Sequence, residues 1–195
     1  MAAEQLWVSD ITYIRTLEGF SYLSLITDAY SRKIVGHALH PTLEAAGCIE
    51  ALMMAVSTRK RISDFTLIHH SDRDIQYCSS GYIEVLQSEN IAISMTQTGS
   101  PYENALAERM NGIIKNEFFP KRIYQNHKEA KKAIERIVLT YNNSRPHSSL
   151  DYMTPNKAHD TIGVLKKRYL RNNKSRNAVN QYIWRLCLHI DILLK

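Results

Sequence analysis

The order of strand-like and helix-like segments constrains the fold of this 195-residue chain more than any other feature. Three β-branched and aromatic segments follow one another with short links, at residues 6–14, 22–27 and 33–39. Strand-like segments joined in this way predict an antiparallel meander. Because sequential antiparallel strands pair side by side, the first third of the chain is expected to form one half of a sheet.

The remainder of the core alternates between helix and strand. Short strands are predicted at 66–70 and 91–95, with a helix around 82–86 between them. Thr42 is expected to cap a helix whose apolar residues share one face: Ala45, Ile49, Leu52 and Val56. Further helices are predicted over 103–118 and 128–142. The order predicts an α/β fold with a mixed sheet, three antiparallel strands and then parallel strands, flanked by helices.

The positive charge of the chain is concentrated at its C-terminus. Residues 163–195 hold eight Lys and Arg against one acid, whereas residues 1–162 hold 17 basic and 18 acidic residues. We therefore expect a core over 1–162 and a basic tail over 163–195. Such a tail is typical of contact with a polyanion, most often nucleic acid. The alternative is a solvated end with no partner.

Composition excludes several classes of protein. The hydrophobic fraction of 44% is that of a globular chain, and no run approaches the ~18 apolar residues of a membrane helix. The first residues lack a signal-peptide pattern, so we expect a cytoplasmic protein without membrane contact. The three cysteines are odd in number and widely spaced, which argues against a disulfide framework or a structural zinc site.

A cluster of His, Asp and Cys residues near residue 70 could suggest a zinc site. Its members fit no common zinc spacing, and adjacent histidines on a strand point to opposite faces. The cluster consists of His69, His70, Asp72, Asp74 and Cys78. A zinc site is therefore the weaker interpretation.

Three carboxylates stand out by position. Asp10 lies within an apolar strand, where a charge is costly unless it is paired or binds a metal. Asp72 directly follows a short strand, and ligands gather at the carboxyl ends of strands in α/β folds. Glu108 lies on the predicted helix over 103–118. Taken singly, each has a structural alternative: a strand-end hydrogen bond, a turn or helix cap, and a solvated helix face.

The helix over 103–118 carries a polar stripe. At α-helical spacing Asn104, Glu108, Asn111 and Lys115 share one face. An offset apolar face is expected to pack on the sheet, formed by Leu106, Met110, Ile113 and Ile114. The alternative for the polar stripe is a solvated face.

Together these features resemble a known family over about residues 5–160. The motifs that carry the resemblance, besides Glu108 and Lys115, are WVSDITY at 7–13, DAYSRKIVG at 28–36, HSDR at 70–73, QY at 76–77, SPYENA at 100–105, YNNSRPHSSL at 141–150 and TP at 154–155. In this order they resemble the DDE transposases of bacterial insertion sequences, which have a retroviral-integrase-like catalytic core. The resemblance implies a ribonuclease H-like fold.

The resemblance also implies a chemistry. Asp10, Asp72 and Glu108 would be the catalytic residues and hold two Mg²⁺ ions, with Mn²⁺ as a substitute. Two such ions ~3.5–4 Å apart can stabilise the entering and leaving oxygens of a phosphoryl transfer. The implied reaction is metal-dependent DNA strand cleavage and 3′-hydroxyl strand transfer during transposition and DNA integration. It needs no covalent protein–DNA intermediate.

The resemblance extends to residues expected to contact DNA. They are Lys115, Asn111, Asn104, Arg145 and, in the tail, Lys166, Lys167 and Arg168. For Arg145 an alternative role is to hold the C-terminal loop against the core. Asp28 is expected to anchor the turn before Ser31 rather than to act in catalysis. Asp74 departs from the small residue usual there, and it would either perturb metal affinity or face solvent.

The implied partners are DNA, as element ends and target, and further copies of the chain, with localisation in the bacterial cytoplasm at the nucleoid. Relatives carry a helix-turn-helix region upstream, so we expect an excised catalytic core or a truncated gene. Two alternatives stay open. One is a non-catalytic DNA-binding or assembly remnant, and the other is a structure-specific nuclease on the ribonuclease H-like fold.

Overall fold

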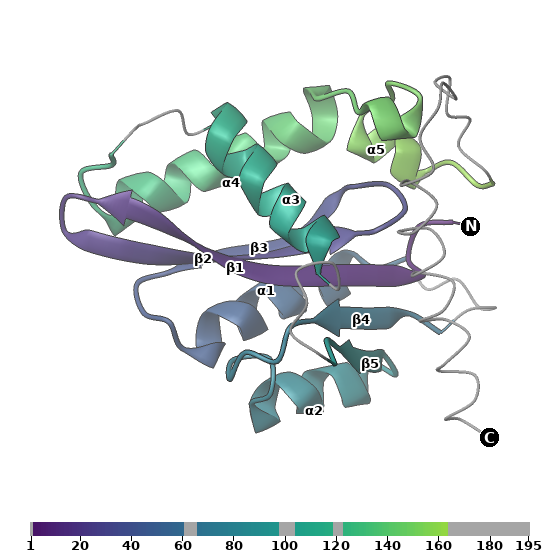
Figure 1. Cartoon of the computed structure of the whole chain (residues 1–195), viewed down its shortest axis with the longest axis horizontal. Helices are drawn as coiled ribbons and strands as arrows, with labels where there is room; N and C mark the ends of the chain where they lie inside the picture. Colours follow the sequence, from purple (N-terminus) through teal and green to yellow (C-terminus); the bar gives the residue numbers. More distant parts are fainter. Residues whose placement is uncertain (1, 61–65, 98–103, 119–122, 164–195) are drawn as a thin grey trace. The chain divides into compact units, whose positions relative to one another are not determined.

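A five-stranded mixed sheet forms the centre of the protein (Figure 1). The computed structural model describes residues 2–60, 66–97, 104–118 and 123–163. The strand order is β3-β2-β1-β4-β5. The strands are β1 (Leu6–Thr16), β2 (Gly19–Asp28), β3 (Ile34–His40), β4 (Ile68–Ser71) and β5 (Ala92–Met95).

The strand directions follow from the lengths of the connections. β1, β2 and β3 are joined by short turns and pair antiparallel. β4 pairs parallel with β1 and with β5, and a helix lies between β4 and β5 in the chain. Parallel neighbours need such a crossover, because the chain must return to the same end of the sheet. The predicted mixed sheet, three antiparallel strands followed by parallel strands, is confirmed.

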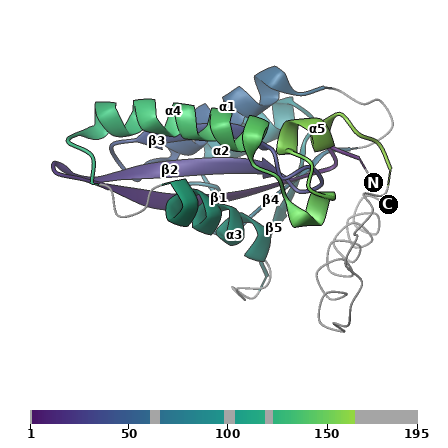
Figure 2. The same ribbon diagram turned by 90° about the horizontal axis from the view of Figure 1, so that it is seen from above.

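Helices cover both faces of the sheet (Figures 1 and 2). On one face lie α1 (Ala45–Thr58) and α2 (Ser80–Ser88). On the other lie α3 (Ala105–Ile113), which continues as a π-helical segment (Ile114–Phe118), and α4 (His127–Ser144). The short helix α5 (Pro155–His159) packs beside α4, after a 3₁₀ turn (Ser148–Leu150).

Each face has its own apolar core. Trp7 and Ile26 pack with α1 and α2, and Ile14 and Leu23 pack with α3 and α4. α1 approaches β3 so closely that a Cβ on Gly36 would clash with the carbonyl oxygen of Ala51. A glycine is therefore required at this point of the strand.

Several sequence-based expectations differ from the structure in detail. Thr42 does not cap α1, because Glu44 is the N-cap residue and the Thr42 hydroxyl lies 3.1 Å from Nδ1 of His40. The predicted single α-helix over 103–118 becomes π-helical from Ile114. The basic tail lies outside the described residues except Gly163, so the proposed boundary at 162 stays a prediction. None of the described helices is both long and apolar enough to cross a membrane.

Candidate active site

The parallel pairing of β1 with β4 brings two of the predicted carboxylates to one place. Leu6 pairs with Ile68 and Val8 pairs with His70. The same register, continued by two residues, reaches Asp10 on β1 and Asp72 at the end of β4. The side chain of Asp10 is held within an ordered strand, and that of Asp72 begins the loop after its strand. This is the carboxyl end of β4, where α/β folds bind ligands.

Asp10 is fixed by hydrogen bonds from two different elements. The backbone N–H of Ile11 donates to Oδ1 at 2.8 Å, and Nδ2 of Asn111 on α3 donates to Oδ2 at 2.7 Å. The carboxyl group is half-buried. Its two oxygens therefore have defined directions before any ligand binds.

α3 is docked on β1 by small and polar side chains. Ala107 packs against Val8, and Nδ2 of Asn104 donates to the backbone carbonyl of Ser9 at 3.0 Å. Asn104 and Asn111 are buried, whereas Glu108, in the first turn of α3, is exposed. The solvated-face alternative is therefore wrong for the two asparagines. The predicted polar stripe splits into amides that face the sheet and a carboxylate that faces solvent.

The three carboxylates lie within one another's electrostatic range. Burial raises the pKa of Asp10 to about 6, and the charges of Asp72 and Glu108 raise it as well, against the two hydrogen bonds. Burial is also the largest cause of the raised pKa of Asp72, followed by the charge of Asp74, with Glu108 adding to it. Like charges that disfavour one another's ionisation are the expected state of a carboxylate cluster without a cation.

The donor set fits a hard divalent cation. Carboxylate oxygens are the ligands that Mg²⁺ prefers, and a cation would relieve the repulsion that raises the pKa of Asp10. The structure brings the three carboxylates near one another without closing a centre. Within residues 2–60, 66–97, 104–118 and 123–163, no three His, Cys, Asp or Glu side chains are grouped closely enough to hold a metal ion.

A buried network supports this end of the sheet, and the sequence analysis did not identify it. The hydroxyls of Ser9 and Tyr82 lie 2.7 and 2.8 Å from Nε2 of His69. Burial lowers the pKa of His69 to about 3, so the ring is neutral at pH 7. The network links β1, β4 and α2, and Ser9 precedes Asp10 directly on β1. All four residues of β4 are buried, so alternation does not distinguish His69 from its neighbours, and no local signal identifies its partners.

His70 uses a different partner from its neighbour. Its Nδ1 lies 2.9 Å from the hydroxyl of Ser94 on β5. The two adjacent rings therefore make separate contacts, as expected for opposite faces of a strand. Asp74 is exposed, as one of its two expected roles requires, and its charge contributes to the raised pKa of Asp72. An effect of Asp74 on metal affinity stays a prediction.

Asp28 has the structural role predicted for it. Its Oδ1 accepts hydrogen bonds from the backbone N–H and the hydroxyl of Ser31, at 2.8 and 2.7 Å. Its Oδ2 accepts from the backbone N–H of Glu4 at 2.8 Å. Asp28 thus anchors the β2–β3 turn and the N-terminal segment.

The predicted DNA-contacting residues have diverse surroundings. Lys115 lies in the π-helical segment, with its Nζ 4.2 Å from the centroid of the Tyr13 ring. Because hydrogen bonds in a π-helix span five residues, the α-helical spacing no longer sets the direction of Lys115. Asn104 and Asn111 are buried against β1. Lys166, Lys167 and Arg168 lie outside the described residues.

Arg145 makes a bidentate ion pair with Glu117. Its Nε and Nη2 lie 2.5 Å from the two carboxylate oxygens, and Nη1 lies 3.0 Å from Nε2 of His147. The pair joins the end of α4 to the π-helical segment. This geometry supports the alternative role of Arg145, which is to hold the C-terminal loop, and its contact with DNA stays a prediction.

Comparison with known proteins assigns this arrangement to a family. A family model described as "Integrase core domain" matches residues 2–101, and a second model with the same description matches residues 89–155. The chain belongs to the integrase core domain family. The predicted resemblance to insertion-sequence transposases with an integrase-like core is confirmed.

Its relatives include transposases of bacterial insertion elements. The core domain is 37% identical over 148 residues to a putative transposase for insertion sequence element IS986/IS6110 of Mycobacterium tuberculosis, covering 74% of this chain and 53% of the relative. It is 34% identical over 155 residues to the transposase for insertion sequence element IS629 of Shigella sonnei, covering 80% and 51%. The chain thus spans about half the length of these relatives.

Solved structures confirm the predicted ribonuclease H-like fold of the core domain. The catalytic core domain of HTLV-2 integrase in complex with magnesium (trimeric form) matches with a TM-score of 0.62 at 20% identity, covering 82% of this chain and 98% of that one. A simian T-cell lymphotropic virus intasome in complex with PP2A regulatory subunit B56 gamma matches with a TM-score of 0.67 at 16% identity, covering 89% and 61%. The likeness at these identities concerns the fold.

Proposed function

We propose that this core domain cleaves DNA strands and transfers a 3′-hydroxyl end to target DNA, with Asp10, Asp72 and Glu108 as ligands of Mg²⁺ or Mn²⁺. One observation carries the proposal. The register of β1 and β4 leads to Asp10 and Asp72, and the charge of Glu108 reaches both carboxyl groups. The names of the relatives, transposases of insertion elements, support the same activity.

The residues of the chain have distinct tasks in this proposal. Bound Mg²⁺ would supply Lewis-acid stabilisation of the charge that develops on the phosphate oxygens. Asp10 holds its carboxylate at a fixed angle through Ile11 and Asn111. Glu108 presents an exposed carboxylate at the first turn of α3, where a bound metal ion or DNA phosphate could reach it. The attacking group is a hydroxyl or water, so the chain need not provide a nucleophile.

DNA and further copies of the chain are the proposed partners. A transposase acts on element ends and on a target, and both are polyanions. Lys115, over the ring of Tyr13, and the basic tail would neutralise phosphates, which contributes to affinity without reading sequence. The neighbouring integrase core has been solved in trimeric and dimeric forms, which supports the proposal of a homo-oligomer.

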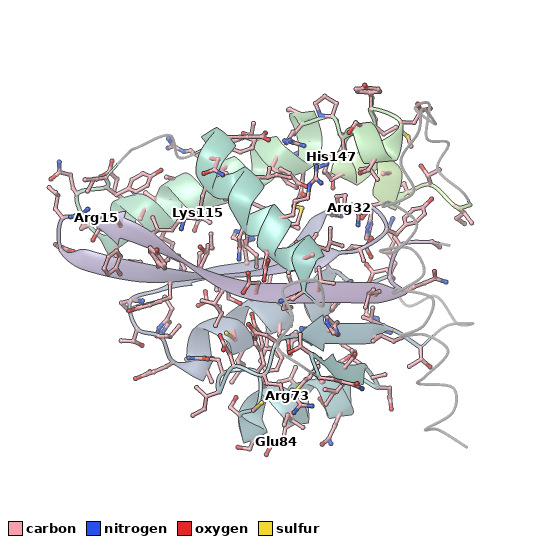
Figure 3. The ribbon with its side chains drawn as sticks, viewed as in Figure 1. Arg15, Arg32, Arg73, Glu84, Lys115 and His147 are labelled. Atoms are coloured by element: carbon pink, nitrogen blue, oxygen red, sulfur yellow. The ribbon has the colours of Figure 1, made fainter. Side chains whose placement is uncertain are left out.

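A strand-transfer assay tests the function. The substrate is a short duplex with a recessed 3′-hydroxyl, the target is plasmid DNA, and Mg²⁺ or Mn²⁺ is the cofactor. Asp10→Asn, Asp72→Asn and Glu108→Gln should each reduce cleavage and joining by on the order of 10²–10³-fold, because each removes a metal ligand. Glu84→Gln, an exposed acid on α2, is the control and should retain parental activity (Figure 3).

The two alternatives predict other outcomes. Full activity in the Asp10, Asp72 and Glu108 variants would show that these acids are structural. A parent protein that binds DNA but neither cuts nor joins it with either metal would favour the non-catalytic remnant. Cleavage that depends on DNA shape and never leads to joining would favour the structure-specific nuclease.

A further inference from the structure

The β1–β2 hairpin carries an exposed aromatic pair beyond the candidate active site. Tyr13 and Phe20 are 56% and 52% exposed. Their ring centroids lie 5.3 Å apart with planes at 76°, an edge-to-face contact between the two strands. Two large aromatic side chains that pack on each other while more than half exposed leave ring surface available to a partner.

Two cations lie with this pair. The Lys115 ammonium lies over the Tyr13 ring at 4.2 Å, and Arg15 is the cross-strand partner of Phe20. Arg15 is exposed, and both cations lie over the hairpin half of β1 (Figure 3). We call Tyr13, Arg15, Phe20 and Lys115 the hairpin surface. Aromatic faces interleaved with cations are the combination that binds single-stranded nucleic acid.

The hairpin surface is close to the carboxylates and open on one side. Tyr13 is three residues from Asp10, about 10 Å along a strand that rises ~3.3 Å per residue. β4 pairs with β1 only from Leu6 to Val8, so in the described part of the chain no strand neighbours β1 on that side between residues 9 and 14. Strand alternation points Asp10 toward α3 and Tyr13 toward the opposite face of the sheet. Lys115, from the α3 side, nevertheless reaches the Tyr13 ring around this open edge. A DNA strand with its reacting phosphate at Asp10 that follows the edge would meet the hairpin surface about three nucleotides away, at ~3.4 Å per nucleotide of a stacked strand.

We propose that Tyr13 and Phe20 stack on bases of an unpaired stretch of DNA next to the reacting phosphate, while Lys115 and Arg15 neutralise phosphates of the same strand. The inference rests on the proposed function, because that function places the phosphate at Asp10. Interior base pairs of a duplex are covered on both faces by stacking, whereas each unpaired base can offer a face to an aromatic ring. The hairpin surface therefore prefers frayed or single-stranded ends over closed duplex.

A binding experiment in chelator tests the inference without requiring the reaction. Fluorescence anisotropy compares a blunt duplex with the same duplex carrying a four-nucleotide single-stranded extension. Tyr13→Ala and Phe20→Ala should each weaken binding of the extended DNA about tenfold, as expected for the loss of one base–aromatic stack. Binding of the blunt duplex should change less than twofold. Fluorescence of a 2-aminopurine base in the extension should be quenched by stacking in the parent complex, and this quenching should be lost in both variants.

Matched variants separate stacking from other effects. Tyr13→Phe keeps the ring and should bind as the parent does. Leu17→Ala removes an apolar side chain that is 65% exposed on the same hairpin, and it should leave both affinities unchanged. All substituted side chains are more than half exposed, so circular dichroism should show an intact fold.

The remaining outcomes overturn the inference. If the parent binds the extended DNA and both alanine variants bind it equally well, only the stacking proposal fails. If the alanine variants change sedimentation of the free protein instead, the hairpin surface joins copies of the chain. A parent that binds neither DNA would contradict the proposed function as well.

Discussion

The side-chain amide of Asn111 donates a hydrogen bond to Oδ2 of Asp10 at 2.7 Å, which connects α3 to the middle of β1. The amide oxygen of Asn111 is buried and has no hydrogen-bond partner among the described residues. An unsatisfied buried acceptor is costly, so of the two polar groups of this amide only the donor contributes a favourable hydrogen bond. The hydrogen bond fixes the direction of the carboxylate and lowers the pKa of Asp10, against the larger effect of burial.

Replacing Asn111 should change the pKa of Asp10. Asn111→Ala removes a hydrogen bond to the charged form, so the pKa of Asp10 should rise above about 6, by roughly one unit for a bond of this kind. The rise would be measured by NMR titration of the carboxyl carbons in chelator. Asn104→Ala, which removes a bond to the Ser9 carbonyl instead, is the control. If Asp10 titrates identically in Asn111→Ala and Asn104→Ala, the hydrogen bond from Asn111 does not lower the pKa of Asp10.

The metal-free protein should become less stable as pH rises from about 4 to 6. Burial raises the pKa of Asp10 from 3.8 to about 6, so the native state binds the proton more tightly than the unfolded state does. Unfolding free energy must then fall with pH in this window, by about 1–2 kcal/mol once solvent screening of a half-buried group is included. Denaturant melts in chelator measure the unfolding free energies of the parent and of Asp10→Asn at each pH. The difference between the two proteins should stop changing with pH below about 4.

Metal should stabilise the parent protein more than its site variants. Mg²⁺ at about 100 times its dissociation constant adds ~2.7 kcal/mol to the stability of a protein that binds it only when folded. Thermal melts with Mg²⁺ and with chelator should show a rise in Tm for the parent. Asp72→Asn and Glu108→Gln should show little rise, and in chelator they should melt no lower than the parent because repulsion is reduced. Lower melting in chelator with an unchanged metal response would mark these acids as structural.

Variants of the Arg145–Glu117 ion pair can distinguish the two roles considered for Arg145, which are holding the C-terminal loop and contacting DNA. If Arg145 mainly holds the C-terminal loop, a double-mutant cycle with Arg145→Ala and Glu117→Ala should give a coupling of about 1 kcal/mol in unfolding free energy. If Arg145 instead contacts DNA, Glu117→Gln should strengthen DNA binding by releasing the guanidinium. We expect the coupling and no gain in affinity. Urea melts and anisotropy titrations measure the two quantities.

The basic tail should contribute to the salt dependence of DNA binding. Substitution of Lys166, Lys167 and Arg168 by alanine should flatten the slope of log affinity against log salt by up to ~2.7, at ~0.9 for each phosphate that the protein no longer neutralises. Lys132→Ala, an exposed lysine of α4, is the control for a single surface charge. An unchanged slope in the triple variant would mean that these three residues do not bind phosphates.

The sequence by itself determined the elements and their order. The β-branched and aromatic residues at 6–14 and 22–27 predict strands, and the short links between them predict that neighbouring strands pair. The anchoring role of Asp28 was likewise predictable. The backbone N–H and the hydroxyl that donate to its carboxylate both belong to Ser31, which is only three residues away. Such features depend on interactions between residues that are close along the chain.

Only the tertiary structure decided which side chains surround the carboxylates. Asn111 meets Asp10 across 101 residues, and Ser9 meets His69 across 60. Helical spacing places Asn104 and Glu108 on one face, yet packing of α3 on β1 buries the amide and leaves the carboxylate exposed. No local pattern contains this information, because the energy of a buried hydrogen bond depends on a partner that the fold brings near.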